Sequence, residues 1–224
     1  MSLPALSLLE TRVLGVLVEK QHTVPDSYPL TLNALVSGAN QKTARDPVIE
    51  ASDAEVQAAL DHLKSLSLVV ESSGGRVMRY AHNAGKAWGL PPQSVALLAV
   101  LFLRGPQTAG ELRINSERLH RFGDILAVEG FLNELAEKPW VRELPKQPGA
   151  RETRWAHLLG TDPGDSWDQA HAPAVAQRGS VPGSDALTTS EVAAIKANVT
   201  QLQGEVEALT ATVARLCKEL GIAP

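Results

Sequence analysis

The sequence predicts a mainly helical α+β protein in which one small unit is built twice and a separate helix follows. A pattern of Arg, two variable residues, Arg, an aromatic residue, Ala and His occupies residues 76–82 and returns at residues 151–157. Each occurrence follows an apolar stripe with helical spacing: Val56, Ala59, Leu60 and Leu63 in the first copy, and Val128, Phe131, Leu132 and Leu135 in the second. Because a repeated unit must bury its own apolar face, we expect each copy to close its own core.

The first copy is predicted to contain three helices and a β-hairpin. We expect helices over 6–20, 28–36 and 52–67 and strands over 68–71 and 76–83, with Pro29 in the first turn of the second helix. Ser52 and Glu55 have the spacing of a capping box, in which each side chain satisfies the backbone amide of the other. The first helix is expected to leave its polar residues for solvent: Glu10, Arg12, Glu19 and Lys20.

The second copy repeats this order. We expect helices over 95–103, 108–122 and 124–138 and strands over 141–144 and 151–158. Thr108 with Glu111 forms a second capping box, and Asp124 caps the third helix. Three helices followed by a hairpin are typical of a winged helix-turn-helix domain, so we predict two of them in tandem, over residues 1–90 and 91–160.

The C-terminal part of the chain has a different pattern. Residues 161–187 are rich in proline and glycine and predict a flexible linker. Residues 188–221 carry a heptad repeat, which predicts a parallel two-stranded coiled coil and hence a homodimer. The predicted dimer contacts are Val192, Ile195, Val199, Leu202, Val206, Leu209, Val213, Leu216 and Leu220. The alternative is a helix that folds back on its own chain.

Composition narrows the class of protein. The net charge is −4, and no segment has the positive excess of a dedicated nucleic-acid binder. The longest apolar run, residues 94–103, is about half of the ~20 residues that a membrane-spanning helix needs. Cys217 is the only cysteine, which excludes internal disulfides. With no secretion signal at the N-terminus, we expect a cytoplasmic protein that makes no membrane contact.

Catalytic and metal-binding patterns are missing from the sequence. The histidines lie in different predicted elements and never stand at a ligand spacing with another histidine or with the cysteine. No glycine-rich phosphate loop occurs, and no nucleophile has an activating partner nearby in sequence. We therefore predict a protein that is not an enzyme and uses no cofactor and no metal ion.

Nucleic-acid binding is the function that the predicted fold suggests. The candidate contacts to phosphate, or to a protein partner, are Asn40, Gln41, Lys42, Arg45, Arg76, Arg79, Arg113, Arg118, Arg121, Lys146, Arg151 and Arg154. Side chains on hairpins and second helices can hold phosphates without reading bases. The structural alternative is that the hairpin arginines pack over the aromatic residues of their strands, and that residues 40–45 satisfy a helix end.

Charge on the third helices argues against sequence-specific reading of DNA. Residues 52–67 and 124–138 both carry more carboxylates than cations, and acidic helices repel phosphate. Two functions are therefore left open. The first is a DNA-associated protein, similar to a transcription regulator, that binds double-stranded DNA. The second is a protein-protein interaction scaffold that uses the winged-helix surfaces and the coiled coil.

Two groups of residues carry a resemblance to a known family. Residues 28–35 with 40–48, and residues 103–108 with 110–113, resemble the signature of the YceH-like family of uncharacterised bacterial proteins. The resemblance covers about residues 6–160. It implies two winged-helix domains in tandem in a bacterial cytoplasmic protein, and it implies no activity.

Overall fold

The computed structural model describes residues 5–73, 77–147 and 149–160 of the chain. The elements of the first copy are α1 (Leu8–Thr23), the 3-10 helix η1 (Pro25–Ser27), α2 (Leu32–Ala39), α3 (Asp53–Ser65), β1 (Val69–Ser72) and β2 (Arg79–His82). After the short helix α4 (Ala84–Trp88), the second copy contains α5 (Pro92–Arg104), α6 (Ala109–Asn115), α7 (Ile125–Glu137), β3 (Val141–Glu143) and β4 (Trp155–His157).

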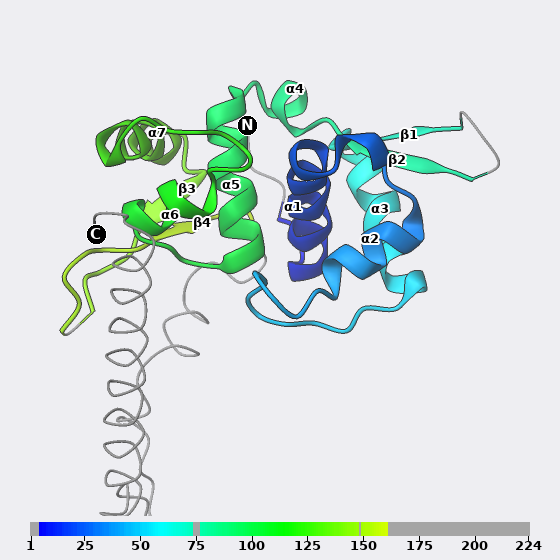
Figure 1. Cartoon of the computed structure of the whole chain (residues 1–224), viewed down its shortest axis with the longest axis horizontal. Coiled ribbons are helices and arrows are strands. Elements are labelled where there is room, and N and C mark those ends of the chain that lie inside the picture. The colour runs from blue at the N-terminus through cyan, green and yellow to red at the C-terminus, as the bar shows by residue number, and fades with distance from the viewer. Residues whose placement is uncertain (1–4, 74–76, 148, 161–224) are drawn as a thin grey trace, which may run out of the picture. The chain divides into compact units, whose positions relative to one another are not determined.

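The predicted fold class is confirmed, because the described residues are mainly helical and their strands form two small antiparallel hairpins (Figure 1). Each copy has three helices followed by a hairpin, which is compatible with the predicted winged-helix order. We call β1–β2 the first hairpin and β3–β4 the second hairpin.

Helix starts were predicted well from the sequence. Both capping boxes are present, at the starts of α3 and α6, and the Asp124 side chain accepts a hydrogen bond from the amide of Ala127. A third capping box, between Ser7 and Glu10, begins α1 and was not predicted. These contacts fix where each helix begins because they satisfy amides that have no partner within the helix.

The two largest errors in the predicted helix boundaries are the start of α2 and the end of α6. Helix α2 begins at Leu32 and not at Tyr28, because the Thr31 hydroxyl caps it and both Tyr28 and Thr31 have an extended backbone. Pro29 therefore lies outside the helix. In the second copy, α6 ends at Asn115 and does not reach Phe122, because the chain turns at Ser116, a buried residue whose carbonyl accepts from the amides of Leu119 and His120.

The repeat extends to the backbone pairing of each copy. Leu30 precedes α2 and exchanges two backbone hydrogen bonds with Tyr80 of the first hairpin, of 3.0 and 2.8 Å. Gln107 precedes α6 and makes the same exchange with Trp155, at 3.1 and 2.7 Å. Each hairpin is thus held by the segment that leads into the second helix of its own copy.

The buried apolar residues form one continuous cluster and not two separate cores. The expectation that each copy closes its own core was therefore wrong. Helix α1 packs against α5, as Figure 1 shows, and the two helices are buried without interruption over Thr11–Val18 and Ser94–Leu103. A helix that is apolar on all sides must be covered on all sides, and here each helix is covered by both copies.

Backbone contacts also join the two copies. The Asp46 amide donates to the carbonyl of Leu103 at the end of α5, at 2.8 Å. The Leu6 amide donates to the carbonyl of Leu159, at 2.7 Å, so the beginning of the first copy is bonded to the end of the second. The boundary at residue 90 thus describes the sequence repeat, while the described residues of both copies belong to one compact unit. The predicted linker and coiled coil, with all nine proposed dimer contacts, lie outside the described residues.

Gly38 in α2 and Gly130 in α7 provide a matched test of this packing. A Cβ atom at Gly38 would lie 2.6 Å from Cγ1 of Val16 in α1, whereas one at Gly130 would meet no atom within 4 Å. We expect Gly38→Ala to lower the free energy of unfolding by about 1–3 kcal/mol, since overpacking strains a dense core. Gly130→Ala should raise it by up to about 1 kcal/mol, because alanine favours helix. Urea unfolding of both variants measures this; equal stability of Gly38→Ala and wild type would contradict the contact.

Candidate interaction surfaces

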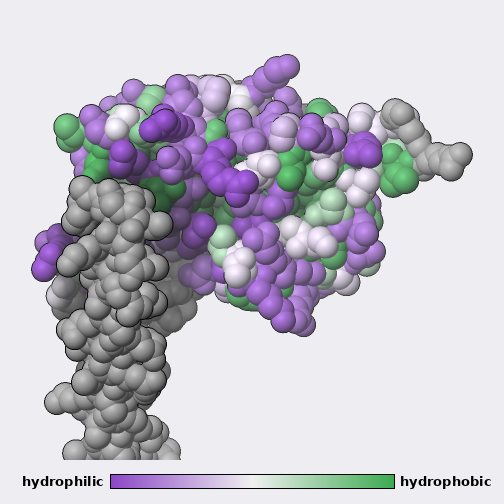
Figure 2. Space-filling view, in the orientation of Figure 1, coloured by the Kyte–Doolittle hydropathy of each residue, from purple (hydrophilic) through white to green (hydrophobic). Residues whose placement is uncertain are grey.

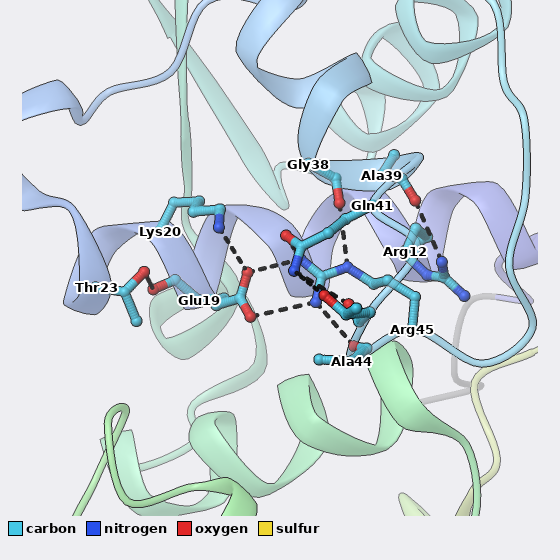
Figure 3. Close-up of polar contacts among 10 residues, drawn as sticks. Arg12, Glu19, Lys20, Thr23, Gly38, Ala39, Gln41, Ala44 and Arg45 are labelled. Carbon is cyan, nitrogen blue, oxygen red and sulfur yellow. Dashed lines mark hydrogen bonds and ion pairs between the residues drawn. The ribbon is translucent and has the colours of Figure 1, made fainter.

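The loop that follows α2 contains the first group of predicted contact residues, and Arg45 lies buried within it. Two of its nitrogens donate to the two carboxylate oxygens of Glu19 in α1, at 2.7 and 3.2 Å, and its Nε donates to the carbonyl of Gly38 at 3.1 Å (Figure 3). The Arg45 side chain has no exposed surface. Arg45 was therefore wrongly predicted to contact phosphate or a partner, because all of its bonding directions point into the protein.

Asn40 has a similar structural role. Its side chain donates to the carbonyl of Ala51 at 2.8 Å and accepts from the Ala51 amide at 2.7 Å, which closes the loop. Gln41 donates to the carbonyl of Thr43 at 3.1 Å. Lys42 is the one member of this group that is exposed and makes no hydrogen bond or ion pair with another described residue.

Arg12 of α1 was expected to face solvent, but it is completely buried. It donates to the carbonyl of Ala39 at 3.3 Å (Figure 3) and to that of Pro47 at 2.7 Å, so it holds both ends of the same loop. Burial, together with repulsion from Arg45, lowers the pKa of Arg12 to about 10. A guanidinium with this pKa keeps its charge at neutral pH.

Glu19 balances the charge of Arg45. Burial alone would raise the pKa of Glu19, but the hydrogen bonds and attraction of Arg45, with the attraction of Lys20, hold it below its ordinary value of 4.5. The carboxylate is therefore ionised at neutral pH. Glu19 was wrongly predicted to face solvent. The helical period identifies the apolar face of α1, but it does not identify a polar residue that forms an ion pair with Arg45 beneath a loop.

The repeated arginines of the hairpins have equivalent partners. Arg79 donates to the carbonyl of Pro29 at 2.8 Å, and Arg154 donates to the carbonyl of Pro106, also at 2.8 Å. Arg154 also forms an ion pair of 3.0 Å with Glu111 of α6. These contacts hold each hairpin to the segment before its second helix. Arg76 lies outside the described residues.

The remaining predicted cations lie on the surface of the second copy. Arg113 is exposed and donates to the carbonyl of Gly123 at 3.4 Å. Four others are exposed and make no hydrogen bond or ion pair within the described part of the chain: Arg118, Arg121, Lys146 and Arg151. These four, with Lys42, are the predicted contact residues that the structure leaves available to a partner.

The last residues of the two hairpins are equivalent histidines. His82 packs edge-on against Tyr28, and His157 packs edge-on against Phe102 at a centroid distance of 4.9 Å. Burial lowers the pKa of each to about 4, with repulsion from His22 adding to the effect at His82. Both rings are therefore neutral at pH 7 and act as packing groups.

The third helices offer little positive charge, as the sequence indicates. Lys64 of α3 forms ion pairs with Glu71 and, at 3.5 Å, with Asp61. Helix α7 contains no lysine or arginine at all. At the start of α7 the side chains of Ile125 and Leu126 are 44% and 74% exposed. This apolar start of α7 lies at the surface of the second copy and was not predicted from the sequence.

A groove of about 510 Å³ lies beside this apolar start. One wall is α7 and the other is the second hairpin, while Ala109 of α6 and Trp155 of β4 contribute apolar surface. A second group of exposed apolar side chains, Val70, Val77 and Met78, lies on the first hairpin, next to its grey end in Figure 2. Sequence analysis found neither surface because both depend on how the hairpins are placed against the helices.

In the described ranges, no three His, Cys, Asp or Glu side chains are grouped so that they could hold a metal ion. No helix there has both the length and the apolar character needed to span a membrane.

The fold and the surfaces together define a mainly helical α+β repeat protein with exposed apolar and charged patches on its second copy. Residues 6–150 match the family model described as "Protein of unknown function, DUF480", and the chain belongs to this uncharacterised bacterial family. The resemblance inferred from residues 28–48 and 103–113 is thereby confirmed.

Similar proteins are known from several bacteria. A UPF0502 protein of Methylibium petroleiphilum is 57% identical over 99% of this chain and 92% of its own length. One from Burkholderia cenocepacia is 54% identical over the same shares, and one from Leptothrix cholodnii is 54% identical over 97% of this chain and 96% of its own. Their similarity includes the residues after 160, although the family model ends at residue 150.

The pair of Arg45 and Glu19 yields a prediction about stability and pH. Glu19→Gln leaves the Arg45 charge buried without a counter-charge, so we expect a loss of about 3 kcal/mol in the free energy of unfolding at pH 7. Because the folded-state pKa of Glu19 is below 4.5, the pair stabilises above that pH and its contribution disappears as the carboxylate protonates at lower pH. The difference between variant and wild type should therefore narrow below pH 4.5.

Urea unfolding at pH 7 and at pH 3.5 measures both effects. Glu50→Gln is the control, because Glu50 lies in the same loop but is exposed and makes no described ion pair. A Glu19→Gln variant as stable as wild type at pH 7 would contradict the structural role of Arg45.

Proposed function

We propose that this protein is a non-enzymatic interaction module whose second copy binds a protein partner through α7 and the second hairpin. The observation that carries the proposal is the surface of α7, which exposes Ile125 and Leu126 and contains no cation. In a helix-turn-helix protein the equivalent helix enters the major groove and needs donors for bases and phosphates. A helix with apolar and acidic side chains is better suited to a protein surface.

The proposal rests on this chain alone, because the family match carries no activity. The interpretation of each copy as a winged-helix module is part of it. Such modules bind through the third helix and the hairpin, and here these elements border one groove. Leu126 and its neighbour Ile125 together expose apolar surface beside this groove, and adjoining exposed apolar side chains indicate an interaction site more than a single one does.

DNA association is the second candidate, and a different group of residues favours it. Arg118 and Arg121 follow α6, and Lys146 and Arg151 lie on the second hairpin, all exposed and without a carboxylate partner among the described residues. Cations at these places can hold phosphates in a way that does not depend on sequence. DNA binding of this kind would use residues at the edges of the second copy and would not place α7 in the major groove of the DNA.

We also propose that two chains associate through residues 188–221. The support is the sequence pattern, in which apolar residues alternate spacings of three and four with valine at most a positions and leucine at most d positions. A dimer would present two copies of each surface on one particle. Two linked sites raise the effective concentration of a partner at the second site, which strengthens weak binding.

A photo-crosslinking residue at position 126 tests which partner α7 meets. With p-benzoylphenylalanine in place of Leu126, we expect adducts in the native host that contain a second protein and survive nuclease treatment. The control position is Lys86 of α4, which is exposed but lies on a different element. Adducts that nuclease removes, together with salt-dependent binding of random duplex that Arg118→Gln/Arg121→Gln weakens, would replace the protein proposal by DNA association.

Self-association is tested by sedimentation equilibrium of the full chain. We expect the mass of a dimer for wild type and of a monomer for Leu202→Glu/Leu209→Glu, because charges at two d positions of one seam repel each other across the dimer. Glu207→Gln, a change outside the predicted seam, is the control and should leave the dimer unchanged. A monomeric wild-type chain at micromolar concentration would contradict the proposal.

A further inference from the structure

The groove between α7 and the second hairpin has walls of different chemistry. On the α7 wall, Ile125, Glu129 and Asn133 are spaced by four residues and therefore lie along one face of the helix. The carboxylate of Glu129 makes no hydrogen bond or ion pair with any other described residue. This wall thus offers an aliphatic surface followed by an uncompensated negative charge.

The hairpin wall adds two more carboxylates. Glu143 accepts a hydrogen bond from the Thr153 hydroxyl, whereas Glu152 has no partner in the part of the chain that the structure describes. Lys146 and Arg151 line the same groove, so three carboxylates stand against two cations. The two carboxylates that have no partner, Glu129 and Glu152, come from opposite walls, which suits a single cation placed between them.

Gly110 keeps one edge of the groove open. A Cβ atom built at Gly110 would lie 4.0 Å from Cδ1 of Ile125 and 3.9 Å from a carboxylate oxygen of Glu152. Both distances are ordinary van der Waals contacts, so a side chain at this position is sterically tolerated. Any larger side chain would extend into the space between the aliphatic surface and the Glu152 carboxylate.

We propose that this groove binds a protein segment that carries a lysine or arginine next to an aliphatic side chain. The aliphatic side chain packs on Ile125, and the cation is held by Glu129 and Glu152. A cation that is held by two carboxylates in a partly enclosed site forms stronger hydrogen bonds than one paired on an open surface. This inference deepens the proposed function and depends on it.

Charge distinguishes this occupant from others. A phosphate backbone would meet three carboxylates and two cations in the groove, so the excess of negative charge raises the electrostatic cost of binding DNA there. A purely apolar segment would cover Glu129 and Glu152 without compensating them, and burying an unpaired carboxylate is costly. Only a segment with both features satisfies the apolar and the acidic part of the groove.

The proposal is tested with random sixteen-residue peptides displayed on phage and selected against the immobilised full-length protein. We expect enrichment of peptides with lysine or arginine within four residues of leucine, isoleucine or valine. Binding of the enriched peptides, measured as synthetic peptides by fluorescence anisotropy, should weaken at least tenfold on Glu129→Gln/Glu152→Gln and on Gly110→Leu. Glu134→Gln is the matched control, since Glu134 is an exposed carboxylate of α7 that does not line the groove.

The outcomes separate this inference from the proposed function. Circular dichroism and urea unfolding first establish that each variant is folded. Enrichment of acidic or uncharged peptides, no enrichment, or equal binding by Gly110→Leu and wild type would overturn the inference. Protein adducts at position 126 could still be found in that case and would leave the interaction module intact. Competition by random duplex or by a peptide of residues 161–224 for the same groove would assign the site to DNA or to the chain itself.

Discussion

The packing of α1 against α5 is the contact on which the rest of the described structure depends. Both helices are buried along most of their length, and Gly15 allows a close approach, since a Cβ atom there would lie 3.0 Å from the Leu103 side chain. Each helix is the first of its copy, so the elements packed around it also depend on the shared contact. The two copies are therefore one cooperative body built from a duplicated unit.

The loop after α2 forms polar contacts with both α1 and α5. Arg12 and Arg45 bring two buried guanidinium groups into this loop, where backbone carbonyls and Glu19 accept hydrogen bonds from them. The loop also donates its Asp46 amide to the end of α5. Arg45 and Asn40, which the sequence suggested for phosphate binding, thus hold in place the loop whose backbone is bonded to α5. A run of polar residues at a helix end is equally suited to either role until its partners are known.

Local signals made most of the secondary structure predictable. Capping residues such as Ser52 and Thr108 placed helix starts, and the periodicity of the apolar residues placed the helices themselves. The shared core was not predicted, although the run of residues 94–103 carried the signal: a helix without a polar face has no side for solvent. The groove was not predictable either, because it requires the relative placement of α7 and the second hairpin. The acidic character of α7 was visible in the sequence and is the part of the site that could be inferred early.

The bond between Leu6 and Leu159 has a practical meaning for work with pieces of this protein. A polypeptide cut at residue 90 would leave α1 without α5 and would strip the segment around Leu6 of its neighbour. Each half would then expose an apolar helix to solvent and would aggregate through it. Truncation, the usual way to assign roles to tandem modules, is therefore unsuitable for this protein. Point substitutions in the intact chain preserve the contact between α1 and α5 on which both copies depend.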